Sequence, residues 1–168
     1  AALWAFSAVI QLLPFTYYTL VWRYPSKWVS LCCPHDPSLS MSHVAHAIKL
    51  IQIIGISYVF EWKMLPWYSL IAIVLGQILN YRVYQLLGTD GVYYGVRFNK
   101  KIRWVSEFPY SVMNDPQYTG AMLSVLGFSP NLPSAHVITL LLGYMYMMAV
   151  ERYEDPTTRA NFEVAKKK

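Results

Sequence analysis

Long uncharged stretches dominate this sequence and constrain its fold more than any other feature. Residues 2–22 carry no formal charge, and neither do residues 116–150, a run of about 35 positions. A helix that crosses the hydrocarbon core of a bilayer needs about 20 mostly apolar residues. Charged residues make up only 14% of the chain, whereas a soluble domain has about 25%. The sequence therefore predicts an all-α integral membrane protein, a single domain built as a bundle of about four to five transmembrane helices.

Three spans are predicted in the first half of the chain: 2–22, 43–60 and 64–87. Proline is tolerated inside a membrane helix, so Pro14 is expected to kink the first span without ending it. Ser40 or Ser42 is expected to cap the second span, because a serine side chain accepts a hydrogen bond from the first turn. Lys49 lies roughly two turns inside that span, close enough to its end for the flexible stem to carry the ammonium group to the membrane surface.

The last apolar stretch is too long for one span. As a single helix it would measure about 52 Å, whereas the hydrocarbon core is about 30 Å thick. Its middle, residues 127–133, reads GFSPNLP, and the two prolines are expected to end one helix and begin another. Either a surface helix precedes a single span, or two spans, 116–128 and 133–150, form a tight helical hairpin.

Positive charge decides between these alternatives, because Lys and Arg gather in the cytosolic loops of membrane proteins. A single span would divide the basic residues evenly between the two sides. A hairpin places the segment 23–42, the loop 88–115 and the tail 151–168 on one side, and leaves Lys63 as the basic residue of the opposite loops. We therefore predict the hairpin, with these three segments in the cytosol and the N-terminus on the far side.

Basic side chains in and near the predicted cytosolic loop are candidates for binding a lipid headgroup. The run comprises Arg97, Lys100, Lys101 and Arg103. It attracts anionic lipids in general, or it clamps the phosphate of one bound lipid, which arginine can hold through two hydrogen bonds. Both interpretations stay open. Arg82 lies inside the third span and is either a functional group or a side chain that reaches the membrane surface.

Acidic side chains on the same side could accept a proton or bind a cation. Glu107 and Asp115 in the loop are each candidates for a general base. Glu151, Glu154 and Asp155 come at the end of the last span, where negative charge opposes the helix dipole and needs a positive partner. That partner is a neighbouring arginine, or a cationic ligand such as a sulfonium or an amino group.

Other kinds of chemistry find little support in the sequence. Cys32, Cys33 and His35 are too few and too closely spaced for a zinc site, which usually has four ligands. We therefore predict no metal. Neither a P-loop nor a Ser-His-Asp pattern is evident, and no nucleic-acid-binding module is visible, so no nucleic-acid partner is expected.

Four short strings together resemble the phospholipid N-methyltransferases, closest to the small plant-type branch. They are G-x-Y-Y-G (91–95), E-F-P (107–109), D-P-x-Y-x-G (115–120) and Y-E-D-P (153–156). The resemblance implies transfer of a methyl group from S-adenosylmethionine to the amine of mono- or dimethylated phosphatidylethanolamine, which yields phosphatidylcholine. It also implies a phospholipid partner and an endoplasmic reticulum membrane, with a mitochondrial membrane as the alternative.

The resemblance further implies which residues form the site. In that family a glycine-rich segment and a pair of acids after the last helix bind S-adenosylmethionine. With Arg82 added as the charged residue of the third span, the cosubstrate site is predicted to comprise Arg82, Gly88, Gly91, Tyr94, Gly95, Glu154 and Asp155. The catalytic candidates are Glu107 or Asp115 as the base, and Tyr118, whose ring attracts a quaternary ammonium. The headgroup candidates are Arg97, Lys100 and Arg103.

A function of a different class remains open at this stage. A member of this fold that has lost catalysis could serve as a structural subunit of a larger membrane complex, with other membrane proteins as its partners. Such a chain would keep its spans and lose the site strings. All four strings are present here, which favours an enzyme.

Overall fold

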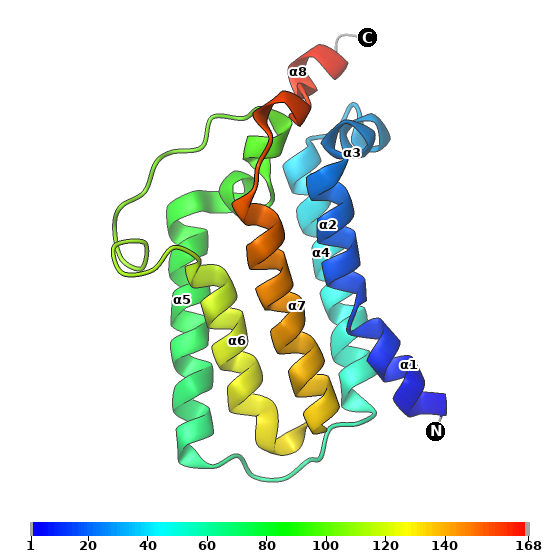
Figure 1. The fold of residues 1–168 in the computed structure, drawn as a ribbon, viewed down its shortest axis with the longest axis vertical. Helices are drawn as coiled ribbons and strands as arrows, with labels where there is room; N and C mark the ends of the chain where they lie inside the picture. The colour runs from blue at the N-terminus through cyan, green and yellow to red at the C-terminus, as the bar shows by residue number, and fades with distance from the viewer. Residues whose placement is uncertain (1, 167–168) are drawn as a thin grey trace.

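Helices account for all the regular secondary structure in the computed structural model, which describes residues 2–166. The α-helices are α1 (Ala2–Ile10), α2 (Leu13–Arg23), α3 (Pro25–Cys32), α4 (Pro37–Ser57), α5 (Trp67–Val92), α6 (Pro116–Phe128), α7 (Ser134–Arg152) and α8 (Phe162–Ala165). Three short 3-10 helices join them: η1 (Gly95–Phe98), η2 (Ser129–Asn131) and η3 (Pro156–Thr158). The long helices lie side by side in a bundle (Figure 1), which confirms the predicted fold class.

Four segments of the described chain are long and apolar enough to cross a membrane: Trp4–Arg23, Pro37–Ser57, Trp67–Phe98 and Ser134–Arg152. The protein is therefore a multi-pass membrane protein. α6 has 13 residues and is about 20 Å long, too short to cross alone. It runs antiparallel to α7, to which η2 connects it, so the last two helices form the predicted hairpin (Figure 1).

The connections gather at the two ends of the bundle. α3, the segment 93–115 and the C-terminal segment lie at one end, which we call the C-terminal end, whereas the N-terminus and the connection 58–66 lie at the other (Figure 1). These are the segments that the charge count groups together. Lys167 and Lys168, which contribute to that count, lie outside the described residues.

The start of α4 differs from the prediction, whereas the kink at Pro14 agrees with it. α4 begins at Pro37, because Asp36 caps it by accepting a hydrogen bond from the Leu39 amide at 2.9 Å. The prediction of a serine cap was therefore wrong. The first span is kinked between α1 and α2 as predicted, since Pro14 has no amide hydrogen and its ring excludes the carbonyl of Ile10 from a helical hydrogen bond. Both helices belong to the one candidate span Trp4–Arg23.

Glycines let α5 and α6 approach until their backbones touch. A Cβ atom added at Gly76 would lie 2.4 Å from the carbonyl oxygen of Gly120, and one added at Gly120 would lie 2.6 Å from that of Gly76. Further along, Gly127 packs against the Ser69 carbonyl in the same way. Small residues serve this purpose in membranes, where van der Waals contact between helices replaces the hydrophobic effect. The α5–α6 pair is the most closely packed part of the bundle.

We predict that Gly76→Ala destabilises the protein by about 1–3 kcal/mol, measured as a lower midpoint of thermal unfolding in detergent micelles. Alanine favours a helix over glycine by about 1 kcal/mol. Without the close backbone contact, the substitution would therefore stabilise the protein. Gly55→Ala is the matched control, because its Cβ would meet only the Ile10 side chain at 3.1 Å. A Gly76→Ala midpoint at or above that of Gly55→Ala would contradict the close packing.

Candidate functional site

Two cavities meet inside the half of the bundle near its C-terminal end. The outer cavity, about 420 Å³, lies among the ends of α5 and α7, the segment 110–115 and the start of α6. The inner cavity, about 290 Å³, lies among α2, α4, α5, α6 and α7. Tyr94 and Tyr118 line both cavities. These two tyrosines therefore form part of the wall between a space near the loops and a space inside the bundle.

The shortness of α6 creates the outer cavity. α6 begins well below the ends of α5 and α7 (Figure 1), with Pro116 in its first turn. The recess above that first turn is lined by Asp115 and Gln117 on one side, and by Gly91 of α5 and Glu151 of α7 on the others. The chain thus brings two carboxylates to one cavity from positions 36 residues apart in the sequence.

Glu151 connects the two tyrosines of the wall. The hydroxyl groups of Tyr94 and Tyr118 both donate hydrogen bonds to its Oε1 atom. Within the described residues its Oε2 atom has no hydrogen-bond partner. Tyr94 has φ = 58°, a left-handed conformation that is uncommon for residues other than glycine and costs energy. Strain of this kind often marks a functional site, and here it positions the phenol against Glu151.

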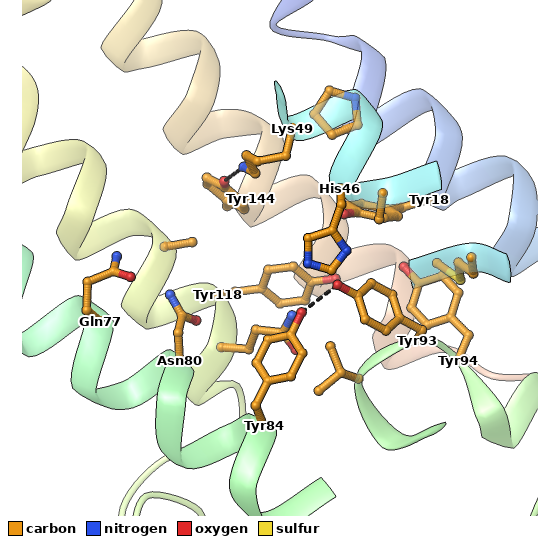
Figure 2. A pocket seen from close by; sticks show the side chains of 16 residues that line it. Tyr18, His46, Lys49, Gln77, Asn80, Tyr84, Tyr93, Tyr94, Tyr118 and Tyr144 are labelled. Atoms are coloured by element: carbon orange, nitrogen blue, oxygen red, sulfur yellow. Dashed lines mark hydrogen bonds between the residues drawn. The ribbon is translucent and has the colours of Figure 1, made fainter. Parts of the chain in front are cut away.

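Polar side chains from α2, α4, α5, α6 and α7 surround the inner cavity (Figure 2). His46 and Lys49 come from α4, whereas Asn80 and Tyr84 come from α5. The Lys49 ammonium group donates to Gln52 Oε1 at 3.0 Å and to the Tyr144 hydroxyl of α7 at 3.4 Å. It therefore points into the bundle and away from the C-terminal end. Lys49 is also exposed at the surface of the bundle, so its reach to the membrane surface stays a prediction.

Arg97, one of the headgroup candidates, is buried at the C-terminal end, and protein acceptors bind its guanidinium group. Its side chain is 3% exposed and lies over the Trp22 ring, with the guanidinium carbon 5.1 Å from the ring centre. It donates to the Trp22 carbonyl at 2.8 and 3.0 Å, to the Asp155 carbonyl at 3.0 Å and to Thr158 Oγ1 at 2.8 Å. Arg97 thus joins the end of α2 to the segment after α7.

The other two headgroup candidates lie at the surface of the C-terminal end. Lys100 pairs with Asp36, its ammonium group 2.6 Å from that carboxylate, and also with Asp90. Arg103 is 80% exposed along its side chain and lies 3.7 Å from Glu107. None of the three lines either cavity, and their role in headgroup binding stays a prediction.

The predicted acid pair after α7 is engaged within the protein. Arg159 donates to both carboxylate oxygens of Glu154, at 2.6 and 2.7 Å, and this contact lowers the pKa of Glu154 below its usual value. Asp155 accepts from the amide and hydroxyl of Thr157, which lowers its pKa as well. Neither acid lines a cavity, so their contact with a cosubstrate stays a prediction.

The structure brings some predicted site residues together and separates others. The predicted residues that line the outer cavity are Gly91, Tyr94, Asp115 and Tyr118. Those that line neither cavity are Arg82, Gly88, Gly95, Arg97, Lys100, Arg103, Glu107, Glu154 and Asp155. Glu107 lies 4.0 Å from Arg82 and pairs with Arg103 at the surface, 57% exposed along its side chain.

Three further cavity residues were not selected from the sequence. Glu151 was noted as an acid but not chosen, although it is the one carboxylate in the last turn of a long apolar helix. His46 and Lys49 share one face of α4 at a spacing of three residues, which indicates a polar face directed at the bundle interior. The local sequence does not indicate that His46 or Lys49 lies opposite Tyr84, since this arrangement depends on how α4 packs against α5.

Comparison with known proteins gives one family. The model of the family described as phospholipid methyltransferase matches residues 65–165. The chain is similar to "Phosphatidyl-N-methylethanolamine N-methyltransferase" of Arabidopsis thaliana, with 43% identity over 92% of this chain and 95% of the relative. A protein of the same name from Saccharomyces cerevisiae is 36% identical over 55% of this chain and 48% of its own length. No solved structure matches the chain.

We predict that Glu154→Gln lowers stability at pH 7 by about 1 kcal/mol and that this difference shrinks in acid. The folded-state pKa of Glu154 is depressed below 4.5 by Arg159. The ionised Glu154 carboxylate therefore contributes its full stabilisation above pH 4.5. This stabilisation is lost as the pH falls through the lower pKa that Glu154 has in the folded protein. Thermal midpoints of both proteins in micelles, measured between about pH 7 and pH 3, test this expectation. Glu163→Gln, at an exposed position of α8, is the control, and a difference independent of pH would contradict the ion pair.

Proposed function

This chain belongs to the phospholipid methyltransferase family, and we propose that it transfers methyl groups from S-adenosylmethionine to the amine of mono- and dimethylated phosphatidylethanolamine, with phosphatidylcholine as the final product. The name of the Arabidopsis relative supports this choice of acceptor. The main structural support is Glu151, which lies where an outer and an inner cavity share a wall and has one carboxylate oxygen without a partner among the described residues. Such an arrangement suits a reaction between a water-soluble donor and a lipid.

The outer cavity fits the methyl donor. S-adenosylmethionine, when bound, supplies a methyl group on a positively charged sulfur. Asp115, Glu151 and Arg152 are the charged residues that line the cavity, so its lining holds two carboxyl groups against one guanidinium, and this excess of acid attracts a cation. Gly91 presents backbone there without a side chain. The volume of about 420 Å³ lies within the range of about 300–1,000 Å³ that is typical of ligand cavities.

The inner cavity fits the lipid headgroup. His46 and Lys49 of α4 face Gln77 and Tyr84 of α5 across it, and all four side chains are exposed at the surface of the bundle. The mouth of the cavity thus lies between these two helices, toward the lipid tails. A phospholipid can enter there sideways, with its acyl chains left in the bilayer and its amine directed at Tyr118.

The residues of the wall can promote methylation of an amine. The nitrogen lone pair forms a bond to the methyl carbon as the carbon–sulfur bond breaks, so the lipid ammonium must first lose a proton. Glu151 can accept that proton on Oε2 while Tyr94 and Tyr118 hold its other oxygen. The two tyrosine rings attract the product as its nitrogen becomes a quaternary ammonium. Holding both substrates across one wall supplies much of the rate by proximity.

Methyl transfer from labelled S-adenosylmethionine tests this proposal. We expect purified protein in lipid micelles to methylate phosphatidyl-N-methylethanolamine and its dimethylated form, with little product from unmethylated phosphatidylethanolamine. Glu151→Gln should lower kcat by about 100- to 10,000-fold, the usual contribution of a general base. Glu163→Gln is the matched control, because Glu163 is exposed on α8 and lines neither cavity.

Each result of this assay has a defined meaning. Rapid turnover of unmethylated phosphatidylethanolamine would overturn the choice of acceptors. A full kcat in Glu151→Gln would overturn the role of Glu151. Failure to methylate any acceptor, together with no binding of S-adenosylmethionine, would favour a structural subunit in a membrane complex.

We further propose the endoplasmic reticulum membrane as the site of this activity, with a mitochondrial membrane as the alternative, since the family resemblance implies that order. Fractionation of cells that produce the tagged full-length protein should show it with endoplasmic reticulum markers. Enrichment with mitochondrial markers would contradict this placement.

A further inference from the structure

Lys49 is a positive charge in the middle of a membrane helix, and it lines the inner cavity where that cavity meets the surface of the bundle. Its ammonium group has two neutral acceptors, Gln52 Oε1 and the Tyr144 hydroxyl. Within residues 2–166 it forms no ion pair, whereas Arg97, Lys100 and Arg159 each have a carboxylate partner. A lysine in the hydrocarbon region is costly to keep. The position of Lys49 therefore calls for an anionic partner.

The protein itself supplies no anion in the inner cavity, because none of the residues that line it is Asp or Glu. His46 also lines the cavity, and its Nδ1 atom lies 2.6 Å from the Ser42 carbonyl oxygen. A carbonyl cannot donate, so Nδ1 carries the hydrogen in this contact. Among the described residues that line the cavity, Lys49 is the one lysine or arginine.

The distances suit one kind of ligand. Lys49 contacts Tyr144, whose ring centre lies 6.2 Å from that of Tyr118 in the wall with the outer cavity. Figure 2 shows Lys49, Tyr144 and Tyr118 around the same space. In an ethanolamine phospholipid only two carbon atoms and an oxygen separate the amine from the phosphorus. An amine at Tyr118 therefore places the phosphate within reach of Lys49.

We infer that Lys49 binds the phosphodiester anion of the lipid headgroup and so holds the acceptor amine against the wall. This inference rests on the proposed function and adds to it a phosphate site inside the bundle, at a position different from the surface residues Lys100 and Arg103. Asn80, which also lines the cavity, is placed to donate to the same phosphate from α5. The site selects lipids that carry a negative charge next to the amine.

Acceptors with and without that charge test the inference. We compare phosphatidyl-N-methylethanolamine with a diacylglycerol joined to N-methylethanolamine through a neutral carbonate. Wild-type protein should prefer the phosphodiester by about ten- to hundredfold in kcat/KM, as expected for a charge-assisted hydrogen bond. Lys49→Gln should bring this ratio close to one, mainly through KM for the lipid, and Lys49→Arg should retain part of it. The affinity for S-adenosylmethionine should stay unchanged in both variants.

Lys27→Gln is the matched control, because it removes an exposed positive charge of α3 at the C-terminal end that lines neither cavity. It should keep the wild-type preference. An unchanged preference in Lys49→Gln would overturn the inference. Equal loss of activity on both acceptors in that variant would also overturn it, since a structural role predicts this result.

A binding measurement separates this inference from the proposed function. Dihexanoylphosphatidylcholine carries the phosphodiester but accepts no further methyl group. We expect wild-type protein in micelles to bind it more tightly than an analogue with a neutral carbonate link, and Lys49→Gln to lose this difference. If the protein methylates no acceptor yet shows this Lys49-dependent binding, the proposed reaction fails and the phosphate site stands. Equal binding of both probes by wild-type protein overturns the phosphate site.

Discussion

The length of α6 is the constraint on which the arrangement of the site depends. Thirteen residues make a helix of about 20 Å, whereas the hydrocarbon core is about 30 Å thick. The glycine contacts with α5 fix how far along the bundle α6 can lie. Its first turn therefore sits below the ends of its neighbours and leaves the recess that Asp115 and Glu151 line. A full-length helix here would fill the outer cavity.

Two cavities with a common wall allow a group to be transferred between a water-soluble donor and a lipid acceptor. The donor and the acceptor both carry positive charge, and they must meet although they arrive from different solvents. The tyrosines of the wall are apolar on their faces and polar at their hydroxyl groups, so they border both spaces. The outer cavity is lined by two acids, Asp115 and Glu151, and by Arg152, whereas the inner cavity is lined by Lys49 and by no acid. The acidic side chains thus lie on the outer side of the wall.

Arg97 and Lys49 are basic residues whose surroundings could not be predicted from the local sequence. Arg97 is buried, and its donors bind the backbone of α2 and of the segment after α7. Local sequence predicts a basic run at the membrane surface, but it does not show which side chain turns inward. Lys49 was expected to extend toward the surface, as most such lysines do. Its direction follows from acceptors on α4 and α7, and the one on α7 is 95 residues away in the sequence.

Composition and helix-breaking residues alone determined the class of the fold and the hairpin, because apolar length and proline act locally. Short strings around Tyr94, Asp115 and Tyr118 likewise indicated the family and a part of the outer cavity. Only the tertiary structure decided that Glu151 joins the two tyrosines while Glu154 pairs with Arg159, and that Lys49 faces a cavity. The physical reason is that the direction of a side chain depends on how the helices pack, and that packing is set by contacts between residues far apart in the sequence.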